Sequence, residues 1–423
     1  MRLLLAALLA AVATAAAAQD IKVYTSDDPL LEMRSFRLPG GKTLPLTVGI
    51  GSAAFRHPSD PPNVIWTLSD RGPNIACSDA KEFGLNRDQF CKAARGGRIY
   101  PVPAYAPSIY RVMLLEDGSF RVTDVITLKD SAGRPVLGLT NPLKTASTET
   151  PLDGQGRVLP QHPANVDAEA LVRLADGSFW IGEENAPSIL QVAADGRILR
   201  RFVPIGTDTE FAGAGYEVIG LFPAIVARRQ SNRGIESIAV SPDEKFLYTM
   251  LQNPLANPDS NAYRKARNTR LFKIDRVAMK VIGEYVYQLS DPRSFRLDPS
   301  DNQSAPRISE MMAIGEDRLV VLERTEGTTH LYTVTLAGAT DIQGSRWDDP
   351  NTSPSLEQAG EDVTPVGKTL LFDSAGHKEI PGKIEGLARL PDGSLVMVND
   401  DDFGIAGGTT KIIVVRGLGL PRN

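Results

Sequence analysis

The chain has 423 residues, of which 42% are hydrophobic and 23% charged, with a formal net charge of −5 at pH 7. This apolar content supports a large core, while a mildly acidic chain without basic blocks is a poor nucleic-acid binder. Beyond the N-terminus, no segment approaches the ~20 apolar residues that a membrane-spanning helix needs. We therefore expect a globular protein with no nucleic-acid partner and no membrane span.

The first 18 residues have the pattern of a secretory signal peptide. Arg2 supplies the positive start, residues 3–12 the apolar stretch, and residues 16–18 a small-residue cleavage site. The alternative is a buried N-terminal helix. We expect residues 1–18 to be a signal peptide, with a mature protein that is periplasmic or secreted.

Two cysteines, Cys77 and Cys91, follow in the first third of the chain. An oxidising compartment allows them to pair, which predicts a local disulfide. A metal site of two thiolates is the weaker alternative, because no histidine lies at metal-finger spacing.

Four apolar runs in the rest of the chain each begin with a glutamate, at intervals of about 70 residues. Short β-rich runs and Asp-Gly turn dipeptides surround them and predict antiparallel hairpins. The leading glutamates are Glu169, Glu236, Glu310 and Glu385. Each unit is interpreted as a four-stranded antiparallel blade, and repeated blades around a channel form a β-propeller.

The predicted fold is therefore all-β, with a single β-propeller domain over residues 19–423 built from five or six four-stranded antiparallel blades. A divergent first blade spans roughly residues 49–128. Weak segments around residues 130–165 and 335–380 leave room for a sixth blade. Because propellers close their own edges, we expect a monomer.

The N-terminal part of the mature chain offers two candidates for the strand that closes the ring. Residues 21–24 or residues 33–38 are expected to complete the last blade.

In each predicted hairpin, the leading glutamate and the polar cluster that ends the next strand lie at the same end. Counting outward from the turn places Glu385 opposite about Asp400, and Glu169 opposite about Glu184. If the glutamate-led strand is innermost, these side chains surround one central mouth. The acidic and amide residues gathered there are Asp70, Glu169, Glu183, Glu184, Glu236, Glu310, Glu323, Glu385, Asn399, Asp400 and Asp401.

So many carboxylates cannot all stay ionised at short range unless protons or cations neutralise them. Carboxylate and amide oxygens suit Ca²⁺ best, and Mg²⁺ or Mn²⁺ less well. The expected ligands of a divalent cation, Ca²⁺ foremost, are Glu169, Glu236, Glu310, Glu385 and Asp400. In the alternative interpretation, each glutamate caps its blade by accepting hydrogen bonds from backbone amides of the neighbouring blade.

Arginines next to the same positions either pair with these carboxylates or present guanidinium groups to an anionic substrate. The residues expected to bind substrate are Asp70, Arg71, Asn74, Arg233, Arg324 and Asn399. The expected catalytic carboxylates, one of which acts as the general base, are Glu169, Glu184, Glu236 and Glu385.

Four short motifs in combination resemble one family. They are SDRGPN at residues 69–74, DAEAL at 167–171, NRGIESI at 232–238 and KIEGL at 383–387. Together they are similar to the exported bacterial phytase-like proteins described as having esterase-like activity, over about residues 45–415. The resemblance implies a β-propeller and hydrolysis of esters, phosphate esters included. True propeller phytases carry denser acidic loops around several Ca²⁺ ions than this chain has.

Three hypotheses for function are compatible with these patterns. The first is a metal-assisted hydrolase acting on a small-molecule ester or phosphoester. The second is a calcium-dependent lactonase with six blades and one metal in the channel. The third is a non-catalytic propeller that recognises an envelope component, with Arg–Glu pairs blocking its mouth.

Overall fold

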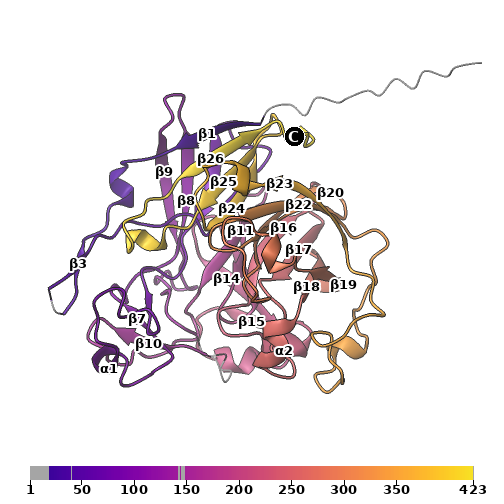
Figure 1. Ribbon diagram of the computed structural model, residues 1–423, viewed down its shortest axis with the longest axis horizontal. Coiled ribbons are helices and arrows are strands. Elements are labelled where there is room, and N and C mark those ends of the chain that lie inside the picture. The colour runs from indigo at the N-terminus through magenta and orange to yellow at the C-terminus, as the bar shows by residue number, and fades with distance from the viewer. Residues whose placement is uncertain (1–18, 40, 142, 144–147, 423) are drawn as a thin grey trace, which may run out of the picture.

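The computed structural model describes residues 19–39, 41–141, 143 and 148–422. The predicted signal peptide lies outside the described residues. Within them, five sheets follow one another along the chain and surround a common centre (Figure 1).

The first two sheets come from the N-terminal half of the chain. The first consists of β4 (Ala53–Phe55), β5 (Val64–Leu68), β8 (Ser108–Leu114) and β9 (Phe120–Thr127). The second consists of β11 (Ala168–Arg173), β12 (Phe179–Glu183), β13 (Ser188–Val192), β14 (Ile198–Pro204) and a fifth strand, β15 (Glu217–Phe222), which runs parallel to β14.

The other three sheets have four strands each. The third consists of β16 (Ile235–Val240), β17 (Phe246–Leu251), β18 (Asn268–Asp275) and β19 (Lys280–Gln288). The fourth consists of β20 (Arg307–Gly315), β21 (Arg318–Arg324), β22 (Thr329–Thr335) and β23 (Gly367–Asp373). The fifth consists of β24 (Ile384–Arg389), β25 (Leu395–Asn399), β26 (Ile412–Arg416) and β1 (Asp20–Tyr24).

The first strand of each sheet lies innermost. Strands β4, β11, β16, β20 and β24 contact one another in this order, and β24 returns to β4. Antiparallel sheets arranged radially around a channel define a β-propeller, so the predicted fold is confirmed.

Hydrophobic clusters between neighbouring sheets hold the ring together. Trp180 and Phe272 belong to the cluster between the second and third sheets, and Met397 and Val320 to that between the fourth and fifth. Similar clusters fill the other three interfaces. Because both faces of each sheet are covered, inner strands such as Phe179–Glu183 are buried at every position. This burial explains why the sequences of these strands are continuous apolar runs and do not alternate between apolar and polar residues.

The N-terminal strand closes the ring. Residues Asp20–Tyr24 pair antiparallel with β26, and the indigo β1 lies beside the yellow β26 in Figure 1. The prediction that residues 21–24 complete the last blade is confirmed. The alternative segment lies elsewhere, with β2 (Phe36–Arg37) pairing with β3 (Thr43–Leu44).

Neither weak segment forms a further blade within the described residues. The segment after residue 335 supplies β23, the outer strand of the fourth sheet. The segment before residue 165 supplies β10 (Thr150–Asp153), which pairs with β7 (Gly97–Tyr100) in a small sheet completed by β6 (Ile75–Ala76).

The disulfide stabilises this small sheet and the short helix α1 (Arg87–Phe90) beside it. Cys77 and Cys91 are joined, with their Cα atoms 5.9 Å apart, so the predicted pairing is confirmed. The other helices are short: α2 (Ser260–Lys265) and the 3-10 turns Pro29–Leu31, Asp208–Phe211, Ala224–Arg228, Pro292–Ser294, Arg346–Asp348, Ser374–Gly376 and Asp402–Gly404. No helix in the described part of the chain is long and apolar enough to cross a membrane.

Candidate functional site

Four of the innermost strands carry a β-bulge near their start. The bulged residues are Glu169 in β11, Glu236 in β16, Ser309 in β20 and Glu385 in β24. A bulge inserts one extra residue, breaks the alternation of the strand and redirects a side chain. The three bulged glutamates all line one cavity at the mouth of the channel.

The bulges correct two predictions. The register pairs Ala168 with Glu183, and Ile384 with Asn399, so the positions expected opposite Glu169 and Glu385, about Glu184 and Asp400, lie one residue too far along the second strand. The pairs next to the turn would place Glu169 opposite Glu183 and Glu385 opposite Asn399, and the bulge leaves both glutamates without a pairing partner in the register.

Glu310 is the second correction. The bulge in β20 falls on Ser309, so Glu310 is not equivalent to the other leading glutamates. It is buried and accepts a hydrogen bond from the backbone amide of Met311 at 3.0 Å. Burial raises the pKa of Glu310 well above its usual value, while backbone hydrogen bonds, including those of Ile238 and Ala54 on neighbouring inner strands, oppose this. The alternative interpretation, in which a glutamate bonds neighbouring backbone amides, therefore describes Glu310.

The cavity at the mouth has a volume of about 530 Å³. Ten of the predicted site residues line it: Asp70, Arg71, Asn74, Glu169, Glu184, Arg233, Glu236, Arg324, Glu385 and Asp400. Glu310 and Asn399 are not among its described lining residues. Asn399 instead accepts a hydrogen bond from the backbone amide of Lys411 at 2.7 Å.

Three other acids expected near the mouth have partners of their own. Glu183 is fully buried and pairs with Arg201. Glu323 is also fully buried and lies 2.9 Å from Lys368. Asp401 accepts a hydrogen bond from Thr47 at 3.3 Å.

Sequence reasoning missed several residues of the cavity. Arg98 comes from the insertion that carries the disulfide and Glu149 from the later insertion that carries β10, and neither insertion has a repeat pattern. Three further cavity residues lie at the ends of strands in the fourth and fifth sheets: Arg307, Glu326 and Lys383. In the sequence, only their closeness to the bulged strands could have marked them as cavity residues.

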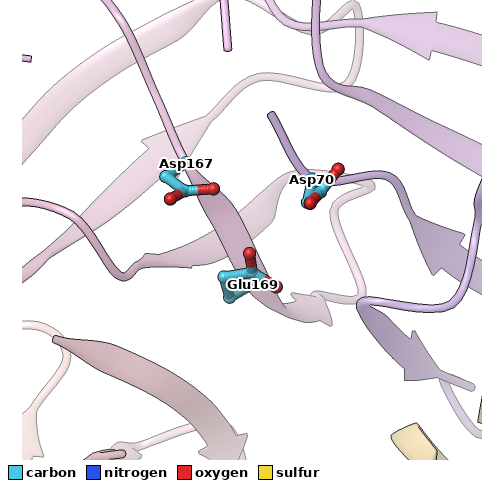
Figure 2. A group of neighbouring side chains, drawn as sticks. All are labelled: Asp70, Asp167 and Glu169. Carbon is cyan, nitrogen blue, oxygen red and sulfur yellow. The ribbon is translucent and has the colours of Figure 1, made fainter. Parts of the chain in front are cut away.

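Figure 2 shows Asp70, Asp167 and Glu169 pointing toward one another, with one ligand oxygen of each within 4.8 Å of the others. Burial raises the pKa of all three carboxyls. The neighbouring charge of Glu236 raises the pKa of Glu169 further, and that of Asp400 does the same for Asp70. Crowded carboxylates of this kind bind either protons or a cation.

The free oxygen atoms of this cluster fit a divalent cation. Oδ1 of Asp167 and Oε2 of Glu236 are buried without a hydrogen-bond donor in the described structure, whereas Oδ2 of Asp167 is paired with Arg71. Oxygen-only donors of this type suit Ca²⁺. Of the three residues in this candidate cation site, only Glu169 was predicted as a ligand; Asp70 was predicted to bind substrate, and Asp167 was not among the predicted site residues.

Arginines border the acidic cluster on the side of the insertion. Arg71 lies 2.9 Å from Asp167 and 3.3 Å from Glu149, and Arg98 lies 2.7 Å from Glu149. Burial opposes ionisation of Glu149, but Arg98 and Arg71 outweigh it and lower its pKa to about 2. Glu149 is thus a fixed negative charge that holds two arginines at the cavity wall.

A second set of charges forms ion pairs between neighbouring sheets, the second with the third and the fourth with the fifth. Arg233 lies 3.5 Å from Glu184, and Arg324 contacts Glu385 directly. Burial raises the pKa of Glu236 to about 7, although Arg324 opposes this shift. The cavity therefore contains one carboxyl that titrates near neutrality.

Gly234 explains how Arg233 and Glu236 reach the cavity. A Cβ atom at Gly234 would lie 2.1 Å from the carbonyl oxygen of Glu184. Only glycine lets the chain enter β16 this close to the second sheet.

The fold and the cavity define a β-propeller with a charged site at one mouth of its channel. Residues 49–403 match the phytase-like family, described as "esterase-like activity of phytase". This match spans most of the chain, and the protein belongs to that family.

An uncharacterized secreted protein of Arthroderma benhamiae is 25% identical over 197 residues. The match covers 42% of this chain and only 38% of the relative. The disulfide agrees with an oxidising compartment.

Solved structures with similar folds include a luciferin-regenerating enzyme, at 10% identity and a TM-score of 0.36, with 96% of this chain and 98% of the other covered. A streptogramin B lyase matches at 9% identity and a TM-score of 0.32, with 94% and 98% covered. Similarities at this level assign no function.

Proposed function

We propose that this protein is an exported hydrolase of small anionic esters, phosphate esters foremost, that works with a divalent cation in the cavity at the channel mouth. The observation that supports this most is the pairing of a buried acidic cluster with several cavity-lining arginines. An enzyme for anionic esters needs both elements, one to bind a cation and one to bind the charged group.

Asp70, Asp167 and Glu169 would hold the cation, Ca²⁺ by the nature of their oxygen donors. When bound there, a divalent cation polarises an ester oxygen and increases the acidity of a water molecule. Arg71, Arg233 and Arg324 orient the anionic part of the substrate through charge-assisted hydrogen bonds.

Glu236 is the best candidate for the general base. A base works best when its pKa lies near the operating pH, and the pKa of Glu236 is raised to about 7. Its Oε2 atom has no hydrogen-bond partner in the described structure, whereas Glu385 is held by Arg324. Burial raises the pKa of Glu169 and Glu184 well above the usual value, which favours their protonated forms over the ionised forms that could accept a proton.

Turnover of 4-nitrophenyl phosphate, 4-nitrophenyl acetate and a lactone, each with Ca²⁺ and with chelator, tests the proposal. We expect hydrolysis of the phosphate ester that chelator abolishes, and a fall of at least 100-fold in kcat for Glu236→Gln. Glu217→Gln, at an exposed glutamate far from the cavity lining, is the matched control and should retain full activity. Equal rates in Glu236→Gln and in the control would contradict the assignment of the base.

A non-catalytic binding propeller is the second candidate. The ion pairs of Arg71, Arg233 and Arg324 at the mouth favour it, since such pairs satisfy these charges without a substrate. The cavity between them nevertheless has space for a small molecule. Absence of turnover with every ester and metal, together with intact folding, would favour binding over catalysis.

A further inference from the structure

Arg307 and Arg324 lie directly opposite each other on two adjacent antiparallel strands at the wall of the cavity. Arg307 begins β20 and Arg324 ends β21, and the register pairs them directly. Both residues line the cavity. Like charges directly opposite each other destabilise a sheet, so the fold gains nothing from this arrangement.

The two arginines differ in how they are neutralised. Arg324 is buried, contacts Glu385 and donates through Nε to Ser309 Oγ at 2.9 Å. Arg307 has one close carboxylate among the described residues, that of Glu326 at 2.7 Å. Burial, with Arg324 and Arg233 nearby, lowers the pKa of Arg307 to about 10, and Glu326 and Glu236 only partly oppose this.

Glu326 is well placed to give way to another anion. Its side chain is 58% exposed, and it lies 4.0 Å from Arg324 as well as close to Arg307. Ion pairs with a solvent-exposed partner contribute little to stability. Its carboxylate is therefore a solvent-accessible single charge in front of two guanidinium groups.

We propose that Arg307 and Arg324 form a subsite for a phosphate-type dianion, and that Glu326 occupies this subsite until such a group displaces it. A dianion brings two charges where Glu326 brings one, and guanidinium groups match the geometry of phosphate oxygens. The subsite belongs to the fourth sheet, whereas the acidic cluster belongs to the first two. The substrate class, which rests on the proposed hydrolase function, is an ester that carries a second phosphate group not itself cleaved.

Calorimetric titration of the mature protein with inorganic phosphate, glycerol 3-phosphate and acetate tests the subsite. Chelator is present throughout, so that no metal contributes to binding. We expect Glu326→Gln to bind phosphate at least threefold more tightly and Arg307→Gln at least tenfold more weakly than the wild type. Arg293→Gln, at an exposed arginine paired with Asp301, is the control and should bind phosphate as the wild type does.

Several results would overturn the proposal. Unchanged or weaker phosphate binding in Glu326→Gln would show that Glu326 does not compete for the subsite, and this variant alters only an exposed side chain. If acetate bound as tightly as phosphate, the subsite would have no preference for a dianion over a monoanion. Tighter binding of inorganic phosphate without tighter binding of glycerol 3-phosphate would overturn the assignment to a substrate group.

Thermal unfolding of Arg307→Gln gives a second readout. Because the substitution removes a like-charge cross-strand pair, we expect an unchanged or higher Tm. A Tm lowered by several degrees would mean that Arg307 serves the fold and would contradict the subsite. Phosphate binding and thermal unfolding are both measured without turnover. If the subsite exists but the hydrolase proposal is wrong, the protein will bind phosphate as described here and will not hydrolyse any ester.

Discussion

Arg201 and Glu183 form an ion pair in which neither side chain is exposed to solvent. Ser188 Oγ and the backbone carbonyl of Asn165 also accept hydrogen bonds from Arg201. Removing one partner of such a pair leaves a buried charge without compensation. The pair lies behind the acidic cavity residues and fixes the end of β12.

We expect Arg201→Gln to lower the free energy of unfolding by about 3–5 kcal/mol, because Glu183 then loses its counter-charge. Urea unfolding measures this change. Arg197→Gln, at an exposed pair with Asp195, is the control and should change stability by less than about 0.5 kcal/mol. Equal effects of the two substitutions would contradict a structural role for the buried pair.

Glu149 predicts a dependence of stability on pH. Its folded pKa of about 2 lies below its usual value of 4.5, so its contribution is present above pH 4.5 and is lost as pH falls toward 2. The shift corresponds to about 3 kcal/mol. Glu149→Gln should lose about this much at pH 7, with a flatter fall in stability between pH 4.5 and 2. An unaltered pH profile by chemical denaturation would refute the role given to Arg98 and Arg71.

Individual residues show where sequence reasoning succeeded and where it did not. Glu169, Glu236 and Glu385 could be placed at one mouth because the repeat gives each the same position in its blade. Glu310 could not be separated from them, because the bulge in β20 depends on hydrogen bonds that no residue pattern reveals. Arg98 and Glu149 lie in two separate insertions without a repeat, so nothing in their spacing indicated the cavity.

At the scale of elements, the strand that closes the ring determines whether the fifth sheet is complete. Strand β1 pairs with β26 over residues 20–24 and brings the buried side chain of Tyr24 to the interface with the first sheet. An N-terminal closing strand was predictable because propellers need a partner for the last blade, but the sequence left residues 21–24 and 33–38 as equal candidates.

Deletion of residues 20–24 should lower the free energy of unfolding by about 3 kcal/mol, since Tyr24 and its apolar neighbours lose their burial. Thermal and urea unfolding of the shortened protein check this. Asp20→Asn, which removes only an exposed ion pair with Arg416, should behave as the wild type. A shortened protein as stable as the wild type would show that β1 does not close the ring.

At the scale of the whole molecule, the propeller brings residues from all five sheets and two insertions to a single opening. Asp70 follows β5 and Asp400 follows β25, yet both line one cavity. The repeat made this convergence predictable, whereas the fifth strand of the second sheet and the insertion module were not, since each occurs once along the chain.

The stability of the whole protein should depend on cations at this opening. The folded pKa values of Asp70, Glu169 and Glu184 are raised by burial, so without a cation their contribution favours folding at low pH and is lost as pH rises. A bound cation removes this penalty, and it competes with protons for the same oxygens.

The most direct test of the account is thermal unfolding of the mature protein with Ca²⁺ or with chelator, at pH 5 and at pH 8. We predict that Ca²⁺ raises the Tm, more at pH 8 than at pH 5, by an amount equivalent to about 2.7 kcal/mol at 100 times its dissociation constant. Glu169→Gln should lose most of this shift. Identical Tm values in Ca²⁺, Mg²⁺, Mn²⁺ and chelator at both pH values would contradict a cation site at the channel mouth.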